Sequence, residues 1–169
     1  MAAVITVLSY HGSSPVGTDQ TNLSVAFKRA DSDTVDLTSP VPIPTAGTNY
    51  SWAKYLKINV VSGLVGNIGN IQFFAATAPE DWANSIALYA KTSSSYSQPS
   101  SADETGIGGM TNVDSYPSGT PLTVNSASNA ITTTGTGSQN YVLLQMAVLS
   151  TATSGLKEGR KLAYRYNET

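Results

Sequence analysis

Cysteine is absent from this chain, and histidine occurs once, as His11. Without thiols the protein has no disulfide, no thiolate metal site and no cysteine nucleophile. A single histidine excludes a site with several histidine ligands, and no G-x-S-x-G sequence accompanies His11 to suggest a Ser-His-Asp hydrolase. We therefore expect a non-enzymatic protein, with no catalytic residue, no cofactor and no metal ligand.

Charge is also scarce. Charged residues make up 12% of the chain, about half the usual share of a soluble domain, while hydrophobic residues make up 40% and the formal net charge is −2. There is no excess of Lys and Arg to neutralise phosphates, so nucleic-acid binding is disfavoured. The remaining surface must be uncharged and polar, mainly Ser and Thr. Such an exterior is typical of proteins packed against neighbours, although a glycan-binding module can look the same.

Long hydrophobic runs are missing as well. The N-terminal run Val4 to Leu8 breaks at Ser9 and Tyr10, which makes it too short for a membrane span, and no basic segment precedes it. We expect no membrane contact and synthesis in a cytoplasm. The length of 169 residues fits one domain, which we divide into an N-terminal strand or arm over residues 1–21 and a β domain over residues 22–169.

Apolar residues alternate with polar ones at many places, and no stripe of helical period occurs, which predicts half-buried strands. The clearest alternations predict strands around residues 23–27, 56–60, 142–148 and 162–166. Weaker patterns predict strands at 4–8, 34–37, 71–74, 86–91 and 122–124. In the last strand, Leu162, Tyr164 and Tyr166 should share a buried face. About eight short strands separated by Pro, Gly, Asn and Ser predict an all-β antiparallel sandwich or barrel.

Three segments fall outside this pattern. Pro79 to Ala83 predicts one helical turn. Residues 39–44 have a proline at every second position and predict a stiff connector. Residues 92–120 predict a long loop, which is either a functional contact or a partly disordered surface excursion. The N-terminal segment either pairs with the open sheet edge of a neighbouring subunit or folds back on its own sheet.

An acidic cluster, Asp31, Asp33 and Asp36, suggests calcium at first sight. The spacing departs from an EF-hand loop, because Asp36 stands at the sixth position, where glycine is required, and Pro42 at the twelfth, where glutamate is required. An Asp-rich turn is the favoured interpretation, with a calcium site of another kind as the alternative. Trp52 and Trp82 could stack on a sugar ring, but packing in a core or interface is the commoner role of tryptophan.

Three groups of residues resemble bacteriophage capsid decoration proteins. The first runs from Pro42 to Leu56 and is followed by Ile68 to Ile71, the second is Tyr96 to Pro99, and the third is the tail with Thr151 to Gly155 and Leu162 to Glu168. The resemblance implies a jelly-roll-like β-sandwich, commonly trimeric, that sits on the outside of an icosahedral head and clamps its subunits. Asn167 departs from the pattern, where Asp is frequent.

The resemblance leads us to expect a virion structural protein, made in the host cytoplasm and placed on the outer capsid surface. Its partners would be other copies of itself, as a homotrimer, and the major capsid protein. The candidate interface residues are Trp82, Tyr96, Pro99 and Tyr116. The alternative is a receptor- or glycan-binding module of a tail or head fibre, and a glycan hydrolase is a third possibility that would need two carboxylates facing each other across a cleft.

Overall fold

A computed structural model describes residues 2–126, 129–155 and 157–169 of the chain. The described residues form ten strands and three short 3-10 helices, with no α-helix among them. The strands are β1 Val4–His11, β2 Val16–Asp19, β3 Thr48–Tyr50, β4 Lys54–Ser62, β5 Ile68–Ala75, β6 Ile86–Ser93, β7 Thr111–Asn112, β8 Leu122–Asn125, β9 Tyr141–Leu149 and β10 Leu162–Glu168. The 3-10 helices are η1 Glu80–Trp82, η2 Ser101–Thr105 and η3 Val113–Ser115.

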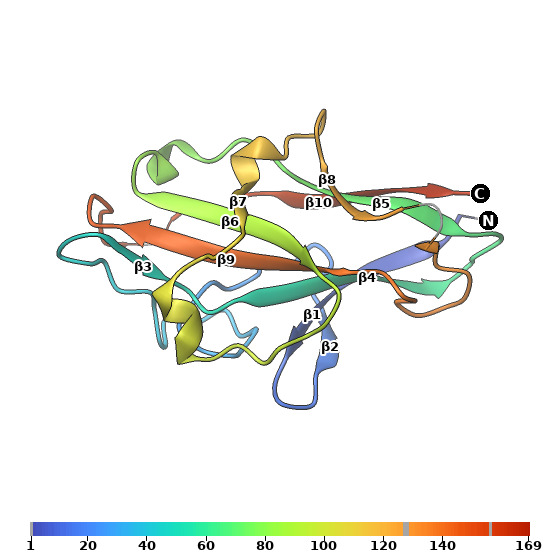
Figure 1. Cartoon of the computed structure of the whole chain (residues 1–169), viewed down its shortest axis with the longest axis horizontal. Coiled ribbons are helices and arrows are strands. Elements are labelled where there is room, and N and C mark those ends of the chain that lie inside the picture. Colours follow the sequence, from blue (N-terminus) through green and yellow to red (C-terminus); the bar gives the residue numbers. More distant parts are fainter. Residues whose placement is uncertain (1, 127–128, 156) are drawn as a thin grey trace.

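The strands form two antiparallel sheets, which confirms the expected all-β sandwich. The large sheet has seven strands in the order β2-β1-β4-β9-β6-β7, with β3 also pairing with β9, and the small sheet has the order β10-β5-β8. In Figure 1 the small sheet lies along the upper edge of the view, and both chain ends emerge on the same side. Backbone hydrogen bonds between Asn67 and Thr169 attach the C-terminus at that side.

Strand β9 is the centre of the large sheet, because it pairs with β6 along one side and with both β3 and β4 along the other. Between β3 and β4 the hydroxyl of Ser51 accepts a hydrogen bond from the Met146 N–H at 3.0 Å, replacing a backbone carbonyl. Beyond the other end of β9, the buried side-chain amide of Gln139 accepts from the Ile58 N–H at 3.3 Å and donates to the Ile58 carbonyl at 2.7 Å. Side chains thus bond the buried backbone groups in the gap between β3 and β4 and beyond the end of β9, as buried backbone groups require.

The core lies between the two sheets and consists of the inward positions of each strand. From the large sheet it contains Leu56, Ile58 and Val60 of β4 and the even-numbered Val142 and Leu144 of β9, all at most 2% exposed. The small sheet contributes Ile71 and Phe73 of β5. Apolar residues at every second position therefore meet across the sandwich, the arrangement that period-2 sequences produce.

Most predicted strands are confirmed, including the faint ones at residues 4–8, 71–74, 86–91 and 122–124. The helical turn is also confirmed, as η1. Residues 39–44 contain no strand and connect to β3, as the prolines predicted. The long loop at 92–120 begins within β6 and contains η2, the two-residue β7 and η3, so it has more local structure than predicted.

Two predicted strands are wrong: residues 23–27 and 34–37 are not extended ladder strands. Their backbone groups bond elsewhere, for example the Arg29 N–H to the Ser39 carbonyl at 2.8 Å. Asn22 and Ser39 adopt positive φ angles of 58° and 50°, which bend the chain away from strand geometry. Of the apolar residues at 23–27, Leu23 is exposed, while Val25 and Phe27 pack against the core.

The N-terminal segment folds back on its own sheet. Strand β1 pairs with β4 from Val4 to Tyr10 and with β2 from Leu8 to His11. The β1–β2 hairpin is thereby part of the large sheet, and its outer strand, β2, has four residues. A short edge strand offers little backbone to a foreign strand.

Strand β10 presents Leu162, Tyr164 and Tyr166 to the core, as predicted. Because the Tyr164 ring packs edge-on against Phe73 with centroids 5.5 Å apart, Tyr164→Ala should lower the free energy of unfolding by about 3 kcal/mol. The Tyr164 hydroxyl is enclosed and has no hydrogen-bond partner among the described residues. Tyr164→Phe removes only that hydroxyl and should be neutral or stabilising. Urea denaturation measures both, and equal losses for the two variants would contradict this packing.

Candidate interaction surfaces

Residues 20–47 form an irregular segment without strands, here called the strap, which joins β2 to β3. The strap packs over the face of the large sheet that also carries the core. Leu56 of β4 belongs to that face. Ser9 of β1 pairs opposite Leu56, and Lys54 precedes Leu56 by two positions along β4, so both side chains lie on the same face as Leu56. Both are buried, and both bond to the strap.

Lys54 carries its ammonium group into the interior at 1% exposure. Its Nζ donates to the Ser32 carbonyl at 2.6 Å and lies 3.8 Å from Asp33 Oδ1. Asp33 also accepts from the Ser9 hydroxyl at 2.9 Å. Burial lowers the pKa of Lys54, and the nearby negative charge of Asp33 opposes that shift. A buried cation of this kind needs its anion, so Lys54 and Asp33 fix the strap to β4.

A second ion pair lies within the strap. Lys28, 4% exposed, donates to Asp36 Oδ1 at 3.0 Å. The hydroxyl and the N–H of Thr38 donate to the same carboxylate at 2.6 and 2.8 Å. The Thr38 hydroxyl, followed by the Lys28 ammonium, lowers the pKa of Asp36 from 3.8 to about 2.

Asp31 completes the set by accepting from the Gly12 N–H at 2.7 Å and from the Gln98 amide at 3.1 Å. The three aspartates are therefore bonded to lysines, backbone and side-chain amides around an Asp-rich turn. In the described part of the chain, no group of three His, Cys, Asp or Glu side chains is placed to hold a metal ion. His11 is the last residue of β1, and its Nε2 lies 3.4 Å from Asp33 Oδ2.

Val25 and Phe27 of the strap pack against the core, but its other large apolar side chains point the other way. Val35 is 66% exposed and Leu37 is 90% exposed, although Asp33 beside them is almost fully buried. Leu23 and Ile43 of the strap are also exposed. The usual distribution is inverted around Asp33, because its carboxylate faces the interior while Val35 and Leu37 face solvent. Exposed apolar groups of this kind mark surfaces that contact another molecule.

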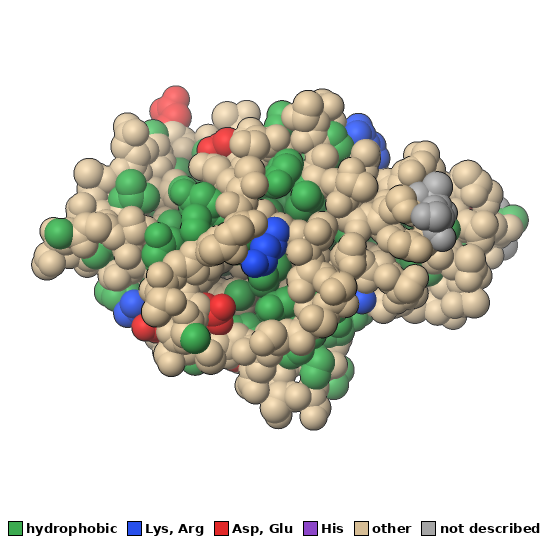
Figure 2. All heavy atoms as spheres, in the orientation of Figure 1, with side chains coloured by type: hydrophobic (Ala, Val, Ile, Leu, Met, Phe, Trp, Pro, Cys, Tyr) green, Lys and Arg blue, Asp and Glu red, His purple; other side chains and the backbone are tan. Residues whose placement is uncertain are grey.

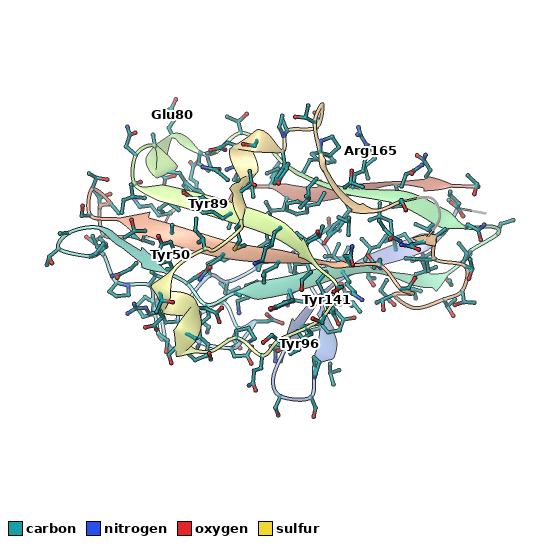
Figure 3. All side chains as sticks on the ribbon, viewed as in Figure 1. Tyr50, Glu80, Tyr89, Tyr96, Tyr141 and Arg165 are labelled. Atoms are coloured by element: carbon teal, nitrogen blue, oxygen red, sulfur yellow. The ribbon has the colours of Figure 1, made fainter. Side chains whose placement is uncertain are left out.

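A second feature lies on the outer face of the large sheet, here called the tyrosine face: Tyr10, Tyr55, Tyr96 and Tyr141. Tyr141 is its centre, with ring centroids 5.2 Å from Tyr10, 5.7 Å from Tyr55 and 6.3 Å from Tyr96. Figure 3 shows Tyr96 and Tyr141 next to each other near the crossing of β1 and β4. The contacts of Tyr141 with Tyr10 and Tyr55 are edge-on, a geometry that stabilises aromatic pairs, and its contact with Tyr96 is tilted.

The loop between β6 and β7 lies over this outer face and is held by specific bonds. The Tyr96 hydroxyl donates to the Gly12 carbonyl at 2.9 Å, and burial followed by the charge of Asp31 raises the pKa of Tyr96. Glu104 lies 3.1 Å from the Arg29 Nε and accepts from the Trp52 indole at 3.2 Å. The Gln145 amide donates to the Asp103 carbonyl. These bonds connect the loop to the strap and to β9.

The four predicted interface residues fall into two groups. Tyr96 and Pro99 belong to the loop over the outer face, Tyr96 half-buried in the tyrosine face and Pro99 buried. Trp82 is 6% exposed and its indole donates to the Glu158 carbonyl at 2.9 Å, so little of its ring reaches solvent. Tyr116 is half-buried against the core. Whether any of them contacts a partner remains a prediction.

A cavity of about 320 Å³ is lined by Trp82, and a second one of about 280 Å³ shares Asp114 with it. Arg160 occupies the wall of the smaller cavity and pairs with Asp114 at 2.6 Å.

Sequence patterns pointed to none of Lys54, Lys57, Val35 or Leu37. Lysine is normally a surface residue, so only the folded chain reveals that these two lysines are buried.

Comparison of the chain with protein families, with curated proteins and with solved structures finds no match. Within the described ranges there is no helix of the length and hydrophobicity needed to cross a membrane. What the protein does is therefore inferred from its own residues.

The Lys54 and Asp33 pair leads to a stability prediction. Lys54→Met leaves the buried Asp33 carboxylate without its cation and should lower the free energy of unfolding by about 3 kcal/mol. Adding Asp33→Asn removes the orphaned charge, so the double variant should recover part of that loss. Urea unfolding of the four proteins in the cycle measures the coupling, and strictly additive losses would show that the two charges do not interact.

The Asp36 carboxylate leads to a prediction about pH. Its folded pKa of about 2 lies below the ordinary 3.8, so its stabilising contribution is fully present above pH 3.8 and is lost as the pH falls through 2. Asp36→Asn should therefore be less stable than the natural protein at neutral pH, and the difference should shrink on acidification below pH 3.8. A difference that stays constant down to the acid limit of folding would mean that the Lys28 and Thr38 contacts do not act on the ionised carboxylate.

Proposed function

We propose that this protein is a structural component of a bacteriophage virion, which decorates the outside of the icosahedral capsid and stabilises it through non-covalent protein contacts. Its partners are further copies of itself, as a homotrimer, and the major capsid protein. Its place is the outer surface of the virion, and its work is adhesion rather than catalysis. The trimer and the capsid partner rest on the resemblance of the chain to decoration proteins.

The inverted strap is the observation that supports this proposal most. Val35 and Leu37 project from a segment whose charged side chains are anchored in the interior. An adhesive surface works best when it is already ordered, because ordering side chains and loops on contact reduces affinity. The buried pair of Lys54 with Asp33 and the partly exposed pair of Lys28 with Asp36 supply that order. The strap is thus a prearranged apolar surface that a capsid subunit can cover.

The rest of the exterior agrees with a role in contact. On the face of the molecule in view, Figure 2 shows green apolar patches among tan atoms, with only a few red and blue side chains. Val16 of β2, for example, is 74% exposed. With charged residues at 12% of the chain, little electrostatic repulsion opposes close packing of copies. A clamp also resists force through interface area, which a broad low-charge surface supplies.

The test alters the strap without altering the fold. The double variant Val35→Ser and Leu37→Ser changes two exposed side chains, so its melting temperature should stay close to that of the natural protein. Its binding to capsids assembled without this protein should weaken by about tenfold or more, as removal of central apolar contacts does. Co-sedimentation with such capsids measures binding. Val65→Ser, at a comparably exposed position outside the strap, is the matched control and should bind more strongly than the double variant.

Two results would overturn the proposal. One is light scattering that shows a monomer at micromolar concentration, together with no affinity for capsids. The other is specific retention on a glycan array, which would favour the receptor-binding alternative instead. Cryo-electron microscopy of intact particles would locate the protein directly.

A further inference from the structure

Lys57 of β4 stands out because its charge has no counter-ion among the residues that the structure describes. The residue is 8% exposed, and the contact it makes is with Tyr141, whose ring centroid lies 4.1 Å from the ammonium group. No carboxylate among the described residues lies within ion-pairing distance of it. Lys28 and Lys54, the other buried lysines, each have an aspartate. Burial lowers the pKa of Lys57, with no acidic neighbour to oppose the shift.

A desolvated cation without an anion is unfavourable, and contact with one aromatic ring compensates for it only in part. The buried side-chain nitrogen and oxygen atoms that lack a hydrogen-bond partner among the described residues do not include Lys57 Nζ. The ammonium group is therefore not fully enclosed. It opens on the outer face of the large sheet, where Lys57 follows Tyr55 by two positions and pairs opposite Leu8 of β1. An anion from another molecule can therefore reach it.

The surroundings define what kind of anion fits. Tyr10, Tyr96 and Tyr141 provide half-buried aromatic surface around a single positive charge. Lys91 of β6, which pairs opposite Leu143 on this face, already donates to the Gly108 carbonyl at 3.0 Å. One unpaired cation suits one carboxylate, whereas a nucleic-acid backbone would require a row of basic residues. The net charge of −2 also disfavours a polyanion.

We propose that Lys57 and the tyrosine face form a docking site for an acidic side chain of a partner protein, with the carboxylate on the Lys57 ammonium and its aliphatic stem against Tyr141. The site lies on the opposite face of the large sheet from the strap contacts of Lys54, so it is a second contact surface. It does not depend on the capsid proposal, because any protein that presents a glutamate or aspartate could use it.

The test uses the isolated protein and two matched peptides, acetyl-Gly-Glu-Gly-amide and acetyl-Gly-Gln-Gly-amide. In NMR titrations the glutamate peptide should produce saturable shifts at Lys57 and at the Tyr141 ring, and the glutamine peptide should produce shifts at least about tenfold weaker in affinity. Added salt should weaken the glutamate interaction. Lys57→Met should abolish it, Lys57→Arg should retain it, and Lys91→Met should leave it unchanged.

Folding does not confuse the result, because Lys57→Met removes a desolvated charge and fills the same space, and Lys57→Arg keeps the charge in place. Equal responses to the two peptides, no response to either, or a response that survives Lys57→Met would each overturn the proposal. Binding of an oligothymidylate in place of the glutamate peptide would also overturn it, since the site would then recognise phosphate. None of these outcomes involves capsid binding, so the failure of one proposal is distinguishable from the failure of the other.

Discussion

The burial of Lys54 determines how the N-terminal third of this protein is arranged. Its ammonium group extends from β4 into the interior and ends on the Ser32 carbonyl and the Asp33 carboxylate. A lysine in that position is tolerated only when its hydrogen bonds and its charge are both compensated. The strap supplies both, and so must lie against this face of the sheet. The other bonds of the strap, from Lys28 to Asp36 and from Gly12 to Asp31, follow from that placement.

Because ion pairs attach this part of the strap, Val35 and Leu37 remain exposed. In an ordinary surface segment, Val35 and Leu37 would provide the attachment and the aspartates would face water. Here Lys28 and Asp33 are buried, and Val35 and Leu37 reach solvent. The resulting surface is ordered before any partner arrives, which is the physical basis for treating it as an adhesive surface rather than a loose connector.

The two faces of the large sheet are therefore specialised in different ways. Its inner face carries the core and the compensated cation Lys54, and its outer face carries the tyrosines and the uncompensated cation Lys57. The loop with η2 connects these regions, because Glu104 bonds to Arg29 of the strap while Asp103 bonds to Gln145 of β9. A partner bound on the outer face would thus contact a layer that is rigidly joined to the strap.

The sequence by itself determined the fold class, because the period-2 pattern of β4, β9 and β10 is a local property that each strand carries with it. It also located η1, the proline connector and the shared face of Leu162, Tyr164 and Tyr166. It failed at residues 23–27 and 34–37, where alternation reflects attachment to the core and to buried lysines, not pairing in a ladder. Only the tertiary structure decided that Lys54 meets Asp33, that Lys57 meets Tyr141, and that Leu37 faces solvent. Those outcomes depend on residues far apart in the chain, whose meeting is set by the packing of the strap and sheets and leaves no signal in the local pattern.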